Sequence, residues 1–228
     1  MYPSDPFSRF PLILCINLDS RPDRWAQCQQ EFAKVGIQDR VERLQASTGV
    51  HPEHGCALSH VRAMRRMLAD GLDRVLVLED DVEFLPNVLT VLAAALLDLG
   101  DRRCDAFFVG CLGGRFDTVA SDLLRVRGTC GTHAVMYSPK ALEVVEGWYG
   151  NLDNWDRPGP IDVVLSDQLV SLGHCYAPNP IAAIQRASPS SMDLTRGHHF
   201  GHEMRYYMLK EWEQAVNNCP GVRPLVLA

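Results

Sequence analysis

The sequence predicts one α/β domain in which helices flank a mostly parallel central sheet. Two observations lead to this fold class: strand-type and helix-type patterns alternate along the chain, and the clearest strand-type segments are almost continuously apolar, as strands buried on both faces are. The chain of 228 residues is long enough for one core. We expect a single domain over 1–228, with an N-terminal extension at 1–10 and a C-terminal loop and helix at 187–228.

Two strand-type segments are the clearest. Leu12–Leu18 is nearly unbroken in apolar residues, and Val75–Leu78 consists of four aliphatic residues that run directly into three acidic ones. The other strand-type segments are shorter: Val41–Ala46, Phe107–Val109, His133–Tyr137 and Ile181–Gln185.

Helix-type segments separate these strands, and several carry their own start and stop residues. In the first, Ser20 is the expected cap, Pro22 lies in the first turn and Gly36 ends the helix. The remaining expected helices are Leu58–Leu68, Pro86–Leu99, Pro139–Trp148, Ile161–Leu172 and His202–Val216. Loops are expected at Gly110–Gly114, Gly150–Pro160 and Ala187–Gly201, whereas Phe116–Gly131 fits neither pattern.

Composition excludes several classes of protein. With 46% hydrophobic and 22% charged residues, the chain is neither disordered nor a coiled coil. The balance of 22 Lys and Arg against 28 Asp and Glu, a net charge of −6, argues against a uniformly basic surface that coats nucleic acid. The apolar stretch Val88–Leu97 is too short to span a bilayer, and no secretory signal is visible, so we expect a cytoplasmic protein.

Eight cysteines invite a disulfide framework, as in a bridged secreted protein. Their context favours reduced, mostly buried thiols, because several lie in apolar runs, no Cys-x-x-Cys pair occurs and a core of this size needs no bridges.

Three consecutive carboxylates, Glu79, Asp80 and Asp81, follow the clearest strand. In an open α/β sheet ligands bind at the carboxyl ends of the strands. Grouped carboxylates repel one another unless a cation compensates, and Mg²⁺ or Mn²⁺ suits their oxygens. A divalent-cation site and a solvated acidic turn are about equally consistent with the triplet alone.

Three motifs in order carry a family resemblance: Ile16–Arg24 (INLDSRPDR), Gly55–His60 (GCALSH) and Val77–Phe84 (VLEDDVEF). Together with Gly131–Ala141 and Pro160–Asp162, they resemble glycosyltransferase family 25, which includes lipooligosaccharide glycosyltransferases and collagen galactosyltransferases. The resemblance spans roughly Leu12 to Gln185. It implies a GT-A fold, a Rossmann-type sandwich that uses a nucleotide-diphosphate sugar, expected to be a UDP-sugar, and Mn²⁺ or Mg²⁺.

Carried over by position, the resemblance implies a role for each motif. Glu79 and Asp81 have the spacing of the two acidic residues in the family's metal motif. Asp81 is the expected metal ligand, and Asp80 is expected to contact the ribose or a metal-bound water. The nucleotide-side residues implied are Asn17, Arg21, Arg24, Ser59 and His60. Arginines and helix N-termini suit a diphosphate, although an ordinary salt bridge is the alternative for Arg24. Ser59 and His60 are expected in the first turn of a helix, as binding residues.

If the reaction inverts the anomeric centre, as the resemblance implies, a carboxylate must take the proton of the acceptor hydroxyl. Asp162 is the first candidate, because it matches Pro-x-Asp at a helix start, and Asp167 is the second. The alternative for Asp162 is a first-turn carboxylate that stabilises its helix by about 0.5 kcal/mol.

Three histidines cluster near the C-terminus, at His198, His199 and His202. They lack partners at zinc-ligand spacing. One of them is a candidate for an additional ligand of the catalytic metal, and we select His202. The alternative is that the three histidines belong to a surface loop before the last helix.

The sequence predicts a metal-dependent glycosyltransferase that transfers a sugar to an acceptor hydroxyl. We expect first that the acceptor is a saccharide and that the enzyme acts in lipopolysaccharide biosynthesis. Two other acceptors stay open: a hydroxylated protein side chain, and a hydroxylated base in phage-type DNA, for which dispersed arginines offer a binding patch. A catalytically silent module that binds nucleotide sugars or glycans is the alternative from another class. Only Ser47–His54 separates the second expected strand from the GCALSH motif, a shorter segment than the family usually has, which implies a shortened loop near the nucleotide or the acceptor.

Overall fold

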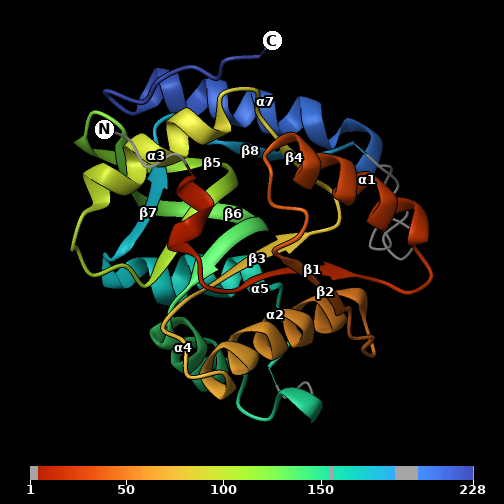
Figure 1. Cartoon of the computed structure of the whole chain (residues 1–228). Helices are drawn as coiled ribbons and strands as arrows, with labels where there is room; N and C mark the ends of the chain where they lie inside the picture. The colour runs from red at the N-terminus through yellow and green to blue at the C-terminus, as the bar shows by residue number, and fades with distance from the viewer. Residues whose placement is uncertain (1–4, 155–156, 188–199, 228) are drawn as a thin grey trace.

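The computed structural model describes residues 5–154, 157–187 and 200–227. One sheet of eight strands forms its centre, in the order β2-β1-β3-β6-β7-β5-β8-β4 (Figure 1). The strands are β1 (Ile13–Asn17), β2 (Val41–Gln45), β3 (Val75–Glu79), β4 (Val82–Phe84), β5 (Ala106–Ala120), β6 (Leu123–Tyr137), β7 (Cys175–Pro178) and β8 (Ala183–Gln185).

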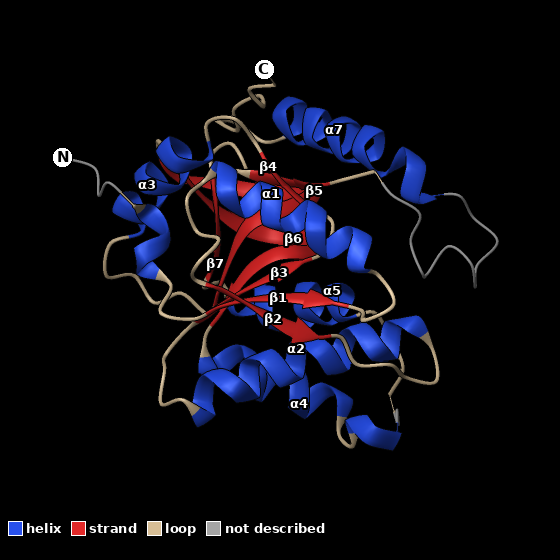
Figure 2. Ribbon diagram, turned by 45° about the vertical axis from the view of Figure 1, so that its right-hand side comes forward, coloured by secondary structure: helices blue, strands red, loops and turns tan. Residues whose placement is uncertain are grey.

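Helices cover both faces of this sheet, so the α/β class predicted from the sequence is confirmed. In Figure 2, α1 and α3 lie on one side of the strands and α2, α4 and α5 on the other. The main helices are α1 (Pro22–Lys34), α2 (Pro52–Ala69), α3 (Val88–Leu99), α4 (Pro139–Tyr149), α5 (Ile161–Val164) and α7 (Phe200–Asn218). A π turn and a 3-10 turn continue α5 to Leu172, and α7 packs along β5.

The sheet is mixed, which corrects the expectation of a mostly parallel one. Its first part is parallel, because α1 and α2 are crossover helices that return the chain to pair β1 with β2 and β1 with β3. From β6 onward both kinds of pair occur: β6 runs against β3, β5 and β7, whereas β5 is parallel to β7 and β8. The N-terminal β1-α1-β2-α2-β3 unit is therefore the Rossmann-type part of the molecule.

The core consists of two apolar clusters, one on each face of the sheet. Alternate residues of β3 divide between them: Leu76 and Leu78 pack with α1 and α3, and Val75 and Val77 with α2 and α4. Because both faces are covered, all four side chains are fully buried, which explains why the segment is continuously aliphatic.

The largest departure from the predicted elements is a long hairpin of β5 and β6. The sequence indicated a loop at Gly110–Gly114 and gave no prediction for Phe116–Gly131, yet both stretches lie in paired strands with repeated register shifts. Glycine is required where the strands crowd other backbone: a Cβ on Gly114 would lie 2.1 Å from the carbonyl oxygen of Gly128. These glycines mark close approach within a sheet and not a turn.

Smaller differences concern element ends. The short strands β4 and β7 were not predicted, and α2 begins at Pro52, six residues before the first expected helical residue Leu58.

The eight cysteines are free thiols, of which Cys130 is exposed. Among the described residues no helix is both long and apolar enough to cross a membrane.

Candidate active site

A cavity of about 310 Å³ opens where the parallel strands β1, β2 and β3 end. Three connections supply its walls: the one after Asn17, the one from Ala46 to Pro52, and the acidic turn Glu79–Asp81. Because parallel strands end at the same edge of a sheet, residues from distant parts of the chain meet here. The sequence-predicted residues that line the cavity are Asn17, Arg24, Ser59, His60, Glu79, Asp80 and Asp81.

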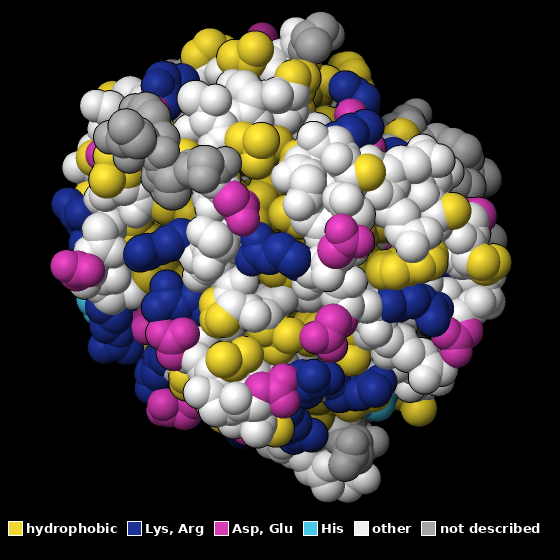
Figure 3. All heavy atoms as spheres, in the orientation of Figure 1, with side chains coloured by type: hydrophobic (Ala, Val, Ile, Leu, Met, Phe, Trp, Pro, Cys, Tyr) yellow, Lys and Arg dark blue, Asp and Glu magenta, His cyan; other side chains and the backbone are white. Residues whose placement is uncertain are grey.

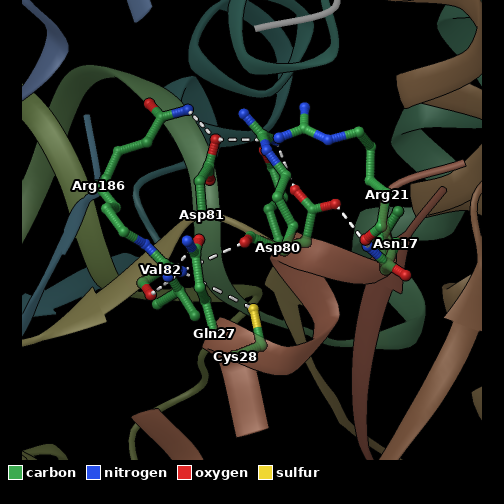
Figure 4. A network of polar contacts seen from close by, with 12 residues as sticks. Asn17, Arg21, Gln27, Cys28, Asp80, Asp81, Val82 and Arg186 are labelled. Atoms are coloured by element: carbon green, nitrogen blue, oxygen red, sulfur yellow. Dashed lines mark hydrogen bonds and ion pairs between the residues drawn. The ribbon is translucent and has the colours of Figure 1, made fainter. Parts of the chain in front are cut away.

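Asp80 is held from two sides. Arg24 donates to its Oδ1 at 2.6 Å and Asn17 donates to its Oδ2 at 2.8 Å (Figure 4). Arg24 and Asp80 are each only 8% exposed, so this is a buried ion pair. With both carboxylate oxygens engaged by donors, Asp80 fixes α1 against the end of β3. The salt bridge considered as the alternative role of Arg24 is thus formed, within the cavity wall.

Asp81 differs from its neighbour because one of its oxygens is unpaired. Gln185 donates to Oδ2 at 2.8 Å, whereas the buried Oδ1 has no hydrogen-bond partner among the described residues. Burial and the adjacent negative charge of Glu79 raise the pKa of Asp81 to about 7. A buried carboxylate oxygen that faces a cavity without a donor fits the ligation of a cation.

Glu79 belongs to a second network that lies on the α2 side of the acidic turn. Its Oε1 is 3.2 Å from Nε2 of His60 and accepts a 2.5 Å hydrogen bond from the hydroxyl of Thr132, and neither contact uses Oε2. Burial acts to raise the pKa of Glu79, but the hydrogen bond and charge of His60, with the Thr132 hydroxyl, outweigh it and lower that pKa. His60 is fully buried, and its Nδ1 lies 3.1 Å from the Tyr137 hydroxyl.

The Ser59 hydroxyl is engaged in two hydrogen bonds that hold the connection after β2 against α2, in the wall of the cavity. Its Oγ accepts from the amide of Ser47 at 2.8 Å and donates to the carbonyl of Gly55 at 2.7 Å. A Cβ on Gly55 would lie 2.6 Å from the Ser47 carbonyl oxygen, so glycine is needed for the connection after β2 to pack this closely on α2. Ser59 and His60 lie about two turns into α2, not in its first turn as expected.

Two residues that the sequence did not point to complete the acidic turn. Gln185 reaches Asp81, and Arg186 donates from Nη2 to the carbonyls of Asp80 and Val82, both at 3.3 Å (Figure 4). Gln185 is the last residue of β8 and Arg186 follows it, and β8 neighbours the short edge strand β4 in the sheet. No local sequence signal links these positions, which lie more than a hundred residues apart.

Three predicted residues do not line the cavity. The Arg21 guanidinium pairs with Asp23, and only its backbone carbonyl accepts from Asn17. Asp162 lies in the first turn of the short helix α5 and accepts from the amides of Gly131 and Val163, so it ties that helix to β6. Asp167 is exposed in the π turn beyond α5.

The histidine cluster is the remaining prediction. His202 lies in α7, but its side chain, like residues His198 and His199, is outside the part of the chain that the structure describes.

Comparison with known families places this site in a class of enzyme. Residues 45–126 match the profile of glycosyltransferase family 25 (LPS biosynthesis protein). This stretch contains α2, the acidic turn and the first part of the β5–β6 hairpin. The chain is a glycosyltransferase. Its resemblance to family 25, indicated by the motifs, is confirmed over the matched residues.

Solved structures with a similar chain trace include the following. A glycosyltransferase involved in the glycosylation of the major capsid of PBCV-1 is 13% identical, with 73% of this chain and 79% of that chain covered and a TM-score of 0.47. A UDP-glucose pyrophosphorylase complexed with UDP-glucose is 10% identical, with 86% and 81% covered and a TM-score of 0.44. A mannose-1-phosphate geranyltransferase from Thermus thermophilus is 10% identical, with 74% and 73% covered and a TM-score of 0.45. No curated protein matches the chain.

Proposed function

We propose that this glycosyltransferase transfers a sugar from a nucleotide-diphosphate donor, a UDP-sugar in the first instance, to an acceptor hydroxyl, and that it depends on a divalent cation. The observation that carries the proposal is the asymmetry of the acidic turn. Asp80 is fully paired with Arg24 and Asn17, while the buried Oδ1 of Asp81 is left without a donor among the described residues, beside the cavity.

The donor nucleotide is proposed to bind in the cavity at the ends of β1, β2 and β3. Asn17, Arg24 and Asp80 form one wall, and the connection Ala46–Pro52 forms another. Backbone amides and the Asp80 carboxylate suit the polar groups of a ribose, and a cavity of about 310 Å³ has the size of a small-molecule site. Arg21 starts α1 next to this wall, with its guanidinium partly exposed, and is proposed to reach the diphosphate.

Glu79 and Asp81 are the residues proposed to hold the cation, because they offer the unpaired Oδ1 of Asp81 and the second oxygen of Glu79. Two carboxylates together with donor phosphates form the usual oxygen set for Mg²⁺ or Mn²⁺. When bound, such a cation neutralises the negative charge that develops on the departing diphosphate. His202 stays a proposed further ligand.

Asp162 is proposed as the base that takes the proton from the acceptor hydroxyl in an inverting transfer, with Asp167 as the second candidate. Its carboxylate is held by two backbone amides at 2.9 and 3.1 Å, which fixes its orientation at the start of α5. Asp162 also lies near Cys56, which lines the cavity. The pKa of the Cys56 thiol is raised mainly by burial, next by the charge of Glu79 and then by the charge of Asp162. An acceptor that extends from the cavity toward α5 would meet Asp162.

A saccharide acceptor fits the surface better than DNA does. The arginines considered for a polyanion patch are dispersed over α2, the segment after α3 and β5: Arg62, Arg65, Arg66, Arg102, Arg103 and Arg115. Several are already paired with acids, Arg65 with Glu146, Arg66 with Asp70, and Arg103 with Asp105. On the face shown in Figure 3, basic and acidic side chains are interspersed.

The proposal is tested by measuring nucleoside diphosphate released from a panel of nucleotide sugars in the presence of Mn²⁺ and a mixture of saccharide acceptors. Release that a chelator abolishes and Asp81→Asn strongly reduces supports it. Asp73→Asn is the matched control, because this exposed carboxylate pairs with Arg74 at the opposite edge of the sheet. Donor binding without release in any mixture would favour the catalytically silent module instead.

A further inference from the structure

Three side chains of different chemistry converge at the inner end of the cavity. Cys56, His60 and Glu79 each offer one ligand atom, and these sulfur, nitrogen and oxygen atoms all lie within 4.8 Å of one another. Cys56 and His60 are four residues apart in α2, so both project from the same face of that helix. Glu79 meets them from the end of β3. All three line the cavity, which gives them a route to solvent.

We infer that these residues form a binding site for a soft divalent cation such as Zn²⁺, distinct from the oxygen site of Asp81. A thiolate and an imidazole select zinc over Mg²⁺ and Mn²⁺, which prefer oxygen ligands. Three protein ligands with a fourth position open to the cavity is an arrangement found in exchangeable zinc sites.

The distances allow such a site with a small adjustment. Ligand atoms around tetrahedral zinc are roughly 3.3–3.7 Å apart, given Zn–N of about 2.0–2.1 Å and Zn–S of about 2.3 Å. The 3.2 Å between His60 Nε2 and Glu79 Oε1 already fits. The Cys56 sulfur lies within 4.8 Å of the other two ligand atoms, so it has to approach them by up to about 1 Å. On binding, the Cys56 thiol proton leaves to water, and the His60 ring proton moves from Nε2 to Nδ1, where it is donated to the Tyr137 oxygen. The His60–Glu79 hydrogen bond then gives way to one bond from each residue to the ion.

Tyr137 supplies the outer contact that a ligating histidine needs. Its hydroxyl lies 3.1 Å from His60 Nδ1, the nitrogen that faces away from Glu79. The His60 ring packs edge-to-face against the Tyr137 ring, with centroids 5.8 Å apart. This contact fixes the imidazole orientation and presents Nε2 to the ion.

The zinc site and the oxygen site beside Asp81 both use Glu79, so zinc binding is expected to affect sugar transfer. This expectation rests on the proposed function. Glu79 has one carboxylate for both sites: its Oε1 would ligate zinc, and its Oε2 is the oxygen proposed for the cation beside Asp81. Zinc on Oε1 withdraws negative charge from that carboxylate and places a second positive charge beside the oxygen site, which weakens binding of the cation there. Zinc bound at Cys56 and His60 is therefore expected to inhibit sugar transfer, and a chelator selective for zinc to relieve that inhibition.

The binding test uses the full-length, metal-free protein and Co²⁺ as a spectroscopic probe for zinc. One equivalent of Co²⁺ is expected to produce a thiolate-to-cobalt charge-transfer band that Zn²⁺ removes and Mn²⁺ does not. Cys56→Ser should lose the band, whereas Cys130→Ser, which alters an exposed thiol, should keep it. A wild-type protein without the band, or a Cys56→Ser variant that retains it, would overturn the inference.

A second variant covers the case in which Cys56→Ser does not fold. Tyr137→Phe removes only the hydroxyl that faces His60 and is expected to weaken Co²⁺ binding about 10–100-fold with the band still present at saturation. Unchanged Co²⁺ affinity in this variant would overturn the role given to Tyr137, and with it the arrangement in which that hydroxyl orients His60 as a ligand. Because neither measurement involves donor or turnover, failure of the zinc site is separate from failure of the proposed function.

Discussion

Replacing Arg24 with methionine tests whether the buried pair with Asp80 holds the cavity wall together. Methionine keeps the length and apolar stem of the side chain but leaves the Asp80 carboxylate, 8% exposed, with Asn17 as its remaining side-chain donor among the described residues. Breaking a buried ion pair by removing one partner costs about 3–5 kcal/mol, against less than about 1 kcal/mol for an exposed pair. We therefore expect Arg24→Met to lower the free energy of unfolding by about 3–5 kcal/mol.

Urea unfolding of the metal-free protein at neutral pH measures this loss. Arg21→Met is the matched control, because Arg21 also lies at the start of α1 but pairs with an exposed carboxylate, Asp23. Its cost should stay within about 1 kcal/mol. The double variant Arg24→Met/Asp80→Asn should recover most of the stability, since no uncompensated charge remains buried. Equal losses for Arg24→Met and Arg21→Met, or a double variant no more stable than the single one, would refute the reasoning.

Three further predictions concern the same site. Folding raises the pKa of Asp81 from an ordinary 3.8 to about 7, so between these two pH values the folded state holds a proton that the unfolded chain has lost. The stability of the metal-free protein therefore falls as the pH rises from about 4 to about 7. Asp81→Asn should flatten this dependence of stability on pH in thermal unfolding, and an unchanged dependence would show that Asp81 is not buried as described. Asp162→Asn should reduce release of nucleoside diphosphate by at least about 100-fold with donor binding intact, whereas unaltered turnover would exclude it as the base. Gly55→Ala should lower stability by about 1–3 kcal/mol in urea unfolding, because its Cβ would meet the Ser47 carbonyl at 2.6 Å, and a neutral effect would mean that the connection after β2 yields easily.

The sequence predicts the parts of the fold whose burial is uniform. β1 and β3 are covered on both faces, so they contain the short, continuous apolar runs that are typical of buried strands. The β5–β6 hairpin has no such signature, because its register shifts break the alternation and its glycines allow close contacts that resemble turn signals. The antiparallel placement of β6 depends on long-range pairing, which local patterns do not encode.

The candidate site divides in the same way. Asn17, Glu79, Asp80 and Asp81 were predictable because each stands at the end of a recognisable strand. The contacts that distinguish the two aspartates were not predictable, since they join distant parts of the chain, as Arg24 does with Asp80, 56 residues away. The hydrogen bonds of Ser59 to Ser47 and Gly55 were likewise not predictable, because they depend on where α2 begins.

Thermal unfolding with a panel of nucleotide sugars, with and without Mn²⁺, tests the proposed function most directly. A ligand present at about 100 times its dissociation constant stabilises the native state by about 2.7 kcal/mol. The proposal predicts that one nucleotide sugar raises the unfolding temperature mainly when Mn²⁺ is present, and that Asp81→Asn abolishes the Mn²⁺-dependent part of that rise. Equal stabilisation with and without Mn²⁺, or an Asp81→Asn variant that responds as the wild type does, would contradict it.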